Sequence, residues 1–228
     1  MPVHGPVNGA ADVVATARAV LFDLDGVLVD SSPVIDRVWR EWAGRHGLAW
    51  EAVEPVLPGR RAVETVAVLA PQLDAEAEGR ELERVQTADL AGISACAGAV
   101  ALTEELTRAG VPWAIVTSGS RATATTRLRA TGLRVPEVLV TADDVAVGKP
   151  DPEGYRAAAL RLGVAAGDCV VVEDADAGVR AARAAGARVV GIEGPGLGPS
   201  AGSVDLTVPS PAGLLGLIGP AARDRLPR

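Results

Sequence analysis

The sequence predicts an α/β fold: a doubly wound, Rossmann-like parallel sheet with an inserted α-helical cap domain. Short apolar runs alternate with Ala- and Arg-rich helical stretches, which is typical of parallel strands buried on both faces. Between residues 31 and 95 the alternation stops, and apolar residues continue at helical spacing without a convincing strand. Because this stretch is too long for a crossover helix, we expect it to form a helical lobe of its own.

Six apolar runs are the expected strands, and the segments between them carry helix-start and helix-end signals. Ser32-Pro33 predicts a helix N-cap followed by proline at the first helical position, and Asp151-Pro152 repeats the pattern. Glycines close the following helical stretches at positions 110, 132, 163 and 186. The expected strands are 19–22, 113–117, 137–140, 169–172, 188–192 and 206–208.

These signals predict a domain layout. Residues 1–14, rich in Pro and Gly, are expected to be a disordered tail. Residues 15–30 and 97–228 are expected to form the core, and residues 31–96 the cap. Hinges are expected at 30–33 and 95–98, where the chain passes between the two lobes.

Composition excludes several classes of protein. The net charge of −7 argues against a nucleic-acid partner, which needs a dense basic face. No apolar run is long enough to span a bilayer, and no signal peptide is evident, so we expect a cytoplasmic protein without a membrane partner. The acidic surface without an apolar stripe favours a monomer. Cys169 opens an apolar run and is expected to be buried, and the two cysteines do not suggest a disulfide framework.

Acidic and hydroxyl side chains follow three of the expected strands. Asp23 and Asp25 come directly after the first, Thr117 and Ser118 end the second, and Asp174 follows a third. Ligands bind beyond the carboxyl ends of strands in such sheets, so these groups should meet at one edge. Clustered carboxylates repel each other unless a cation lies between them, and Mg²⁺ suits oxygen ligands together with a phosphate.

Lys149 is the only lysine of the chain, among 22 Lys and Arg residues. It precedes a predicted helix, and an ammonium is a compact charge suited to one phosphate oxygen and one carboxylate together. Taken singly, Asp23 and Asp25 would be read as a turn and Glu173-Asp174 as a helix cap. Their order and placement give the pattern its specificity.

Four motifs in this order resemble those of the haloacid-dehalogenase-like (HAD) hydrolase superfamily. They cover residues 18–192 in the right sequence, and the helical insert resembles the small cap of the subfamily that contains sugar phosphatases, phosphoglycolate phosphatase and β-phosphoglucomutase. The motifs are residues 23–31 (DLDGVLVDS), 117–120 (TSGS), 148–152 (GKPDP) and 172–179 (VEDADAGV).

The resemblance implies a role for each motif residue. Asp23 would be the nucleophile that forms an aspartyl-phosphate, and Asp25 would protonate the leaving group and then activate water. Asp23, the Asp25 main-chain carbonyl and Asp174 would hold Mg²⁺, with Glu173 supporting them. The phosphoryl oxygens would be bound by Thr117 or Ser118, the Gly119 amide and Lys149.

Departures from the family patterns narrow the activity. Asp25 argues against the dehalogenases, which lack an acid two residues after the nucleophile. The cap contains no lysine, which argues against the phosphonate-cleaving branch. The histidine and arginine positions of the β-phosphoglucomutases look like Ile35 and Ala62, so a mutase is disfavoured.

Residues 59–65 (GRRAVET) resemble the substrate-facing cap loop of sugar and polyol phosphatases. Gly59, Arg60, Arg61 and Glu64 are therefore candidates for substrate contacts, although an Arg–Glu pair at a solvated helix start explains the same pattern. Trp39 and Trp42 are expected in the cap core rather than in the pocket, because of their helical spacing.

We therefore expect a phosphoric monoester hydrolase that acts, with Mg²⁺, on a small sugar or polyol phosphate. The alternatives are a phosphosugar mutase of the β-phosphoglucomutase type, a phosphoglycolate phosphatase and a catalytically silent binding module. The sequence does not choose the substrate, because one methylene or hydroxyl changes specificity by only a few kcal/mol.

Overall fold

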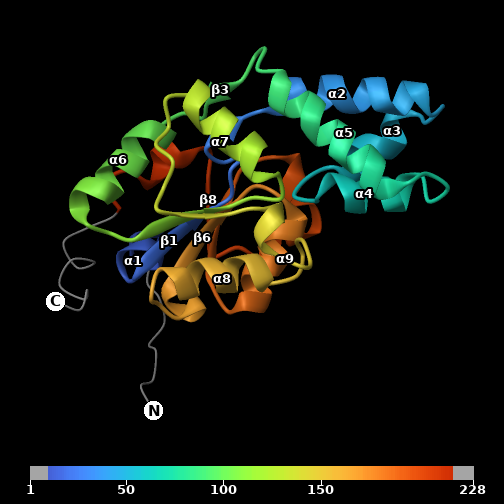
Figure 1. Ribbon diagram of the computed structural model, residues 1–228. Helices are drawn as coiled ribbons and strands as arrows, with labels where there is room; N and C mark the ends of the chain where they lie inside the picture. Colours follow the sequence, from blue (N-terminus) through green and yellow to red (C-terminus); the bar gives the residue numbers. More distant parts are fainter. Residues whose placement is uncertain (1–9, 218–228) are drawn as a thin grey trace.

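A parallel sheet with helices on both faces forms the core, as predicted (Figure 1). The structure is a computed structural model and describes residues 10–217. The strand order is β5-β4-β1-β6-β7-β8, so the chain steps outward in both directions from β1. The strands are β1 (Ala19–Phe22), β4 (Trp113–Val116), β5 (Val138–Val140), β6 (Cys169–Glu173), β7 (Arg188–Ile192) and β8 (Leu206–Val208).

Side chains alternate between the two faces of each strand and so build two apolar layers. Phe22 of β1 lies in the layer beneath α1 (Ala10–Ala15), α6 (Ala99–Ala109) and α7 (Arg121–Ala130). Its neighbour Leu21 lies in the opposite layer, under α8 (Glu153–Arg161) and α9 (Asp176–Ala185). Burial on both faces explains why these strands read as continuous apolar runs.

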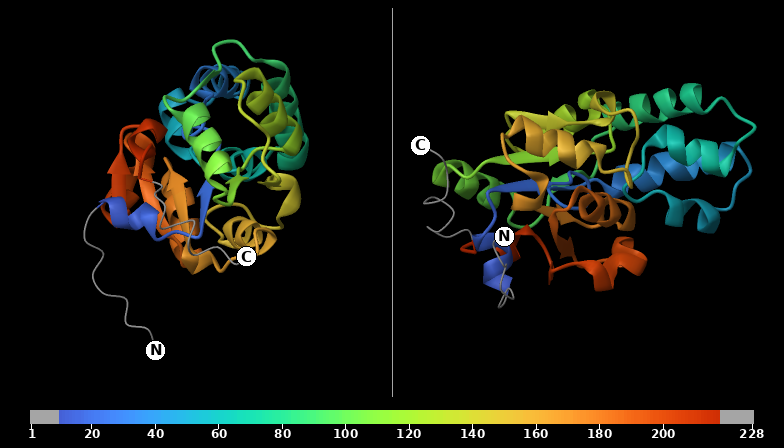
Figure 2. Two further views of the ribbon diagram at one scale, coloured as in Figure 1. Left: turned by 90° about the vertical axis from the view of Figure 1, so that its left-hand side faces the viewer. Right: turned by 90° about the horizontal axis from the view of Figure 1, so that it is seen from below.

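The insert is a helical lobe that lies to one side of the sheet (Figure 2). It consists of α2 (Ser32–Arg45), α3 (Trp50–Val53), α4 (Ala62–Leu69) and α5 (Ala75–Ala88). Trp39 and Trp42 pack edge to face at 5.2 Å in a separate apolar cluster, as expected for cap core, and Trp39 also lines the pocket beneath the cap. The inserted cap is thus confirmed, while its exact boundaries at 31 and 96 stay a prediction.

Two short strands lie where the chain passes between the two lobes. β2 (Val29–Asp30) pairs antiparallel with β3 (Ser94–Ala95), so the outgoing and returning chains lie side by side. The sequence predicted no strand between residues 31 and 95, and this prediction is wrong for its last two residues, which form β3. A two-residue strand is too short to show a periodicity, which is why the sequence pattern missed it.

Three local predictions need correction. Residues 10–14 belong to α1 rather than to a tail, because Val13 and Val14 are buried against the sheet, and residues 1–9 lie outside the described part. Helix α2 begins at Ser32, the predicted cap, and thus one residue before the predicted first helical residue Pro33; Ser31 takes the cap position, but its hydroxyl donates to Asp25 instead of capping the helix. Helix α8 begins at Glu153, so Pro152 precedes the helix.

The four glycines predicted to close helices lie at or just after helix ends with positive φ, as expected. Cys169 is buried, also as expected, and both cysteines are free thiols. None of the helices within residues 10–217 combines the length and apolar character that a bilayer crossing requires.

Candidate active site

The predicted motif residues meet at the carboxyl edge of the sheet. Asp23 follows the central strand β1, which pairs with β4 and β6 on its two sides. Thr117 follows β4, and Asp174 follows β6, whose last residue is Glu173. The pairing of the strands thus brings together side chains that are far apart along the chain.

Lys149 lies between two of these carboxylates. Its ammonium donates to Asp23 Oδ1 and, at 2.6 Å, to Glu173 Oε1. All three side chains are buried. Because a buried charge is costly unless it is paired and hydrogen-bonded, the two carboxylates explain how this ammonium is held in the interior.

Glu173 uses both carboxylate oxygens inside the protein. Oε1 also accepts a hydrogen bond of 2.6 Å from the Tyr155 hydroxyl, and Oε2 accepts from the amides of Asp174 and Ala175 at 3.1 and 3.2 Å. A Cβ at Gly178 would lie 1.7 Å from Oε1. The start of α9 can therefore lie this close to the Glu173 carboxylate only because residue 178 is glycine. Glu173 therefore acts as a fixed support for its neighbours.

Asp174 has neither of its carboxylate oxygens occupied by a donor from the described residues. Within residues 10–217, no side chain or amide donates a hydrogen bond to its carboxylate. Oxygens of Asp23, Glu173 and Asp174 lie within 4.8 Å of one another, which is the spacing of a cation site. Since Glu173 is already saturated, Asp23 and Asp174 are the two side chains that suit a hard cation such as Mg²⁺.

The charge balance of the cluster also fits a cation. Burial raises the pKa of Asp23 to about 7, with Glu173 and Asp25 adding to the rise and Lys149 opposing it. Burial raises the pKa of Asp174 well above its usual range, and the charge of Asp23 adds to this. Burial acts to lower the pKa of Lys149, but Asp23 and Glu173 outweigh it and raise that pKa. One ammonium thus does not balance the carboxylates, and further positive charge would stabilise them.

The loop after β1 passes directly over Asp174. Gly26 has φ of +82°, and a Cβ there would lie 2.0 Å from Asp174 Oδ2. Glycine at this position therefore allows both a left-handed turn and the close approach of the loop to the carboxylate.

Asp25 is held by two donors. Its Oδ1 accepts hydrogen bonds of 2.6 Å from the hydroxyl of Ser31 and from Nη1 of Arg127. Arg127 lies on α7 and is buried, and it did not figure among the predicted site residues.

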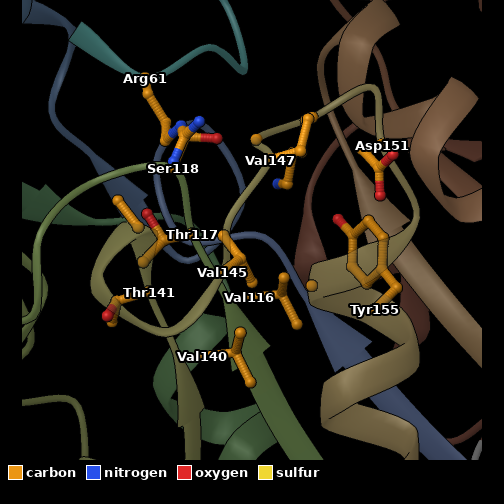
Figure 3. A pocket seen from close by; sticks show the side chains of 14 residues that line it. Arg61, Val116, Thr117, Ser118, Val140, Thr141, Val145, Val147, Asp151 and Tyr155 are labelled. Atoms are coloured by element: carbon orange, nitrogen blue, oxygen red, sulfur yellow. The ribbon is translucent and has the colours of Figure 1, made fainter. Parts of the chain in front are cut away.

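The two predicted phosphate-binding hydroxyls have different partners. Thr117 Oγ1 accepts a hydrogen bond of 3.1 Å from the Gly119 amide, whereas Ser118 Oγ donates to the Gly59 carbonyl at 2.8 Å. Figure 3 shows Ser118 beside Arg61, with Thr117 below them. The Ser118 hydroxyl thus belongs to the contact between core and cap loop, and Thr117 keeps its hydroxyl on the core side.

The cap loop residues Arg61 and Glu64 contact each other and the core. Arg61 Nε donates to Glu64 Oε1 at 2.7 Å, and its Nη2 donates to the Ala146 carbonyl at 3.2 Å. Glu64 Oε1 also accepts from the Gly148 amide at 3.1 Å. The sequence left two interpretations open, contact with the substrate or an Arg–Glu pair, and the structure contains the pair. This pair connects the cap loop to the loop that carries Lys149.

A large pocket lies between the cap and the core, with Arg60 in its wall. Asp23, Asp25 and Asp174 line its core side. Five further acids of the described residues line the rest of it: Asp30, Asp36, Glu54, Glu83 and Glu193. Apart from Arg60, the basic side chain in this part of the wall is Arg127, which is paired with Asp25.

Comparisons with known proteins agree with this geometry. Residues 17–186 match the haloacid dehalogenase-like hydrolase family. Hexitol phosphatase A of Escherichia coli (strain K12) is 45% identical over 196 residues, covering 85% of this chain and 91% of the relative. A plasmid-encoded phosphoglycolate phosphatase of Cupriavidus necator is 40% identical over 227 residues, covering 92% and 97%. CbbY from Rhodobacter sphaeroides, solved in complex with phosphate, is 28% identical with a TM-score of 0.77 and covers 91% and 99%.

The chain therefore belongs to the haloacid dehalogenase-like hydrolases. The predicted class of enzyme, a phosphoric monoester hydrolase of this superfamily, is confirmed at the level of the family and its relatives.

Sequence reasoning missed four polar residues that support the site: Ser31 and Arg127, which donate to Asp25, Gln86, which accepts from Arg127, and Tyr155, which donates to Glu173. Tyr155 is the only tyrosine of the chain, so the reasoning that singled out Lys149 could have found it. Arg127 lies in a helix with two other arginines, and Gln86 lies in a polar cap helix. Nothing in their spacing distinguishes these two from solvated residues.

Proposed function

We propose that this enzyme hydrolyses the phosphate monoester of a small sugar or sugar alcohol, with Asp23 as the nucleophile and Mg²⁺ as the cofactor. The main support for this proposal is the acidic wall of the pocket. Beyond the reacting group, a substrate meets Asp30, Asp36 and Glu54, and Arg60 is the unpaired cation among the described lining residues. Such a wall repels a second anionic group and accepts hydrogen bonds from hydroxyls.

The reaction begins at Asp23. One of its carboxylate oxygens attacks phosphorus, the bond from phosphorus to the leaving alkoxide breaks, and a proton from Asp25 passes to that alkoxide. Water then attacks the aspartyl-phosphate, Asp25 takes up its proton, and the acyl-phosphate bond breaks to release inorganic phosphate. The first half-reaction leaves Asp25 deprotonated, as the second requires, and the second leaves it protonated, as the first requires.

The neighbouring residues stabilise charge on the phosphoryl oxygens. Lys149 lies against Asp23 and supplies a fixed positive charge at the site of attack. The Thr117 hydroxyl and the Gly119 amide, which bond to each other in this structure, are the candidate donors to the phosphoryl oxygens. When bound by Asp23, Asp174 and the Asp25 main-chain carbonyl, Mg²⁺ would neutralise the phosphate and align it with the nucleophile.

The cap residues divide into two roles in this proposal. Arg60 faces the pocket and is the candidate for contact with the substrate. Gly59, Arg61 and Glu64 hold the cap loop against the core, because each bonds to a core residue or to a neighbour that does. Residues 31–96 would then move as a cap about the paired strands β2 and β3.

One relative favours a second candidate function. The phosphoglycolate phosphatase of Cupriavidus necator is 40% identical, and its named substrate carries a carboxylate beside the phosphate. The acidic lining of the pocket argues against that chemistry here. A phosphosugar mutase is disfavoured because Ile35 and Ala62 line the pocket where the mutases carry basic residues.

Inorganic phosphate release from a substrate panel tests the proposal. The panel contains hexose, hexitol and glycerol phosphates, phosphoglycolate, nucleoside monophosphates and β-glucose 1-phosphate, each with Mg²⁺ and with EDTA. We expect Mg²⁺-dependent release concentrated on the sugar and sugar-alcohol phosphates. Preferential release from phosphoglycolate would favour the second candidate. Isomerisation without phosphate release would indicate a mutase, and no turnover of any compound would contradict the proposal.

A further inference from the structure

Arg127 connects the cap to Asp25. Its Nη1 donates to Asp25 Oδ1 at 2.6 Å, and its Nη2 donates to Oε1 of Gln86 on cap helix α5 at 3.1 Å. The Arg127 side chain is 3% exposed, although it lines the wall of the pocket. A guanidinium is buried at a cost of several kcal/mol unless it is well paired. Its position between a core carboxylate and a cap amide therefore calls for a local reason.

The contact of α5 with α7 fixes where this guanidinium lies. Glu83 of α5 accepts hydrogen bonds from the Ser120 amide and the Thr123 hydroxyl at 3.2 and 2.6 Å. The Thr87 hydroxyl lies 2.7 Å from that of Thr123. These contacts hold cap helix α5 against the start of α7. The docked cap therefore places Gln86 of α5 next to Arg127, which lies further along α7.

The contacts of Asp25 leave one of its oxygens available. Ser31 and Arg127 both donate to Oδ1, and among the described residues no donor reaches Oδ2. With Oδ1 anchored at two points, rotation of the carboxyl group is restricted and Oδ2 keeps one direction. A proton-transfer group gains from such restriction because catalysis depends on its placement within hydrogen-bond reach of the reacting oxygen.

We propose that Arg127 is a positioning residue, which fixes Asp25 so that Oδ2 exchanges the proton with the leaving alkoxide and with water. This inference rests on the proposed function. In the first step the bond from phosphorus to the leaving oxygen breaks while the proton moves from Asp25 to that oxygen. Gln86 makes this arrangement depend on a docked cap, since it holds the other arm of the guanidinium.

The proposal makes the effect of Arg127 depend on the leaving group. A sugar alcohol is a poor leaving group and needs the proton of Asp25, whereas nitrophenolate departs without one. Loss of Arg127 should therefore slow release of a sugar alcohol far more than release of nitrophenolate. A purely structural role in cap packing would slow both reactions alike.

Single-turnover kinetics test this, with enzyme in excess so that only the first step is measured. Four proteins are compared: wild type, Arg127→Gln, Arg127→Lys and the exposed control Arg129→Gln. Each is measured on a hexitol phosphate and on a nitrophenyl phosphate. We expect Arg127→Gln to slow hexitol release at least about 100-fold and nitrophenolate release only a few-fold. Arg127→Lys should lie between, because it keeps the charge, and Arg129→Gln should match wild type.

Two results would overturn the inference while leaving the proposed function intact. One is equal slowing of both leaving groups by Arg127→Gln in an enzyme whose wild type is active, and the other is no slowing of either. Rapid nitrophenolate release by the variant would itself show that it is folded. A wild-type enzyme that releases neither leaving group would instead contradict the proposed function, and this inference with it.

Discussion

Lys149 Nζ donates a hydrogen bond of 2.6 Å to Glu173 Oε1, and both groups are buried at the end of the central strands. The same ammonium contacts Asp23. The chain uses arginine at its other basic positions apart from the two histidines, so a lysine at this position reflects the size of the site. A compact ammonium fits between two carboxylates where a planar, forked guanidinium would displace one of them.

Replacement of Lys149 by arginine should therefore abolish most activity despite the conserved charge. We expect kcat/KM to fall at least about 100-fold, as for loss of a preorganised donor at a reacting oxygen. The control is Arg156→Lys on the exposed side of α8, which changes the same chemical pair away from the site and should leave activity unchanged. A Lys149→Arg enzyme with wild-type kcat/KM would contradict the account of this residue.

Asp174→Asn and Glu173→Gln should have opposite consequences. Asp174 has unused oxygens, so its replacement should raise the Mg²⁺ concentration for half-maximal activity at least about tenfold without lowering the melting temperature of the metal-free protein. Glu173 is saturated by internal donors, so its replacement should cost about 1–3 kcal/mol of unfolding free energy. Thermal melts and Mg²⁺ titrations measure both, and a reversed pattern would show that Glu173 is the ligand.

Gly26→Ala should damage the cation site as well as the turn. Its φ of +82° strains any Cβ-bearing residue, and here the Cβ would also collide with Asp174 Oδ2. Gly132→Ala is the matched control, because φ is +72° there and nothing lies within 4 Å of the added Cβ. Both variants should lose about 1 kcal/mol of stability from the backbone, and Gly26→Ala should in addition lose Mg²⁺ affinity. Equal Mg²⁺ affinity in the two variants would contradict the close approach.

Stabilisation by Mg²⁺ should depend on pH. Burial raises the pKa of Asp23 from 3.8 to about 7, so between these values the native metal-free protein keeps a proton that the unfolded chain has lost. A cation must displace this proton, and the pKa of Asp174, the second ligand, is raised as well, so Mg²⁺ affinity should fall at least about tenfold per pH unit below about pH 7. The increase in melting temperature on adding Mg²⁺, measured from pH 5.5 to 8.5, checks this. An increase that is constant or larger at low pH would contradict the sign.

The fold and the core motifs could be predicted because each depends on local sequence. Parallel strands buried on both faces read as apolar runs, and Asp23, Thr117 and Asp174 follow such runs directly. The order of the strands then brings them together without further information. Lys149 was recognisable because it is the only lysine of the chain.

The contacts between cap and core could not be predicted, because they depend on how two lobes meet. Arg61 and Glu64 were candidates for substrate contacts, and they bond to the loop before Lys149. Arg127 and Gln86 lie on helices of different lobes, 41 positions apart, and neither is unusual in its own helix. Ser31 is the last residue of the first motif and precedes the predicted helix cap, and nothing in the sequence indicated that its hydroxyl donates to Asp25.

The most direct test of the central claim is Mg²⁺-dependent phosphate release from a hexitol phosphate by wild type and by Asp23→Asn. The amide of asparagine cannot form the acyl-phosphate, while its size leaves the site intact. We expect turnover in wild type and none in the variant, with melting curves that show both proteins folded. Full Mg²⁺-dependent turnover in Asp23→Asn would contradict the account.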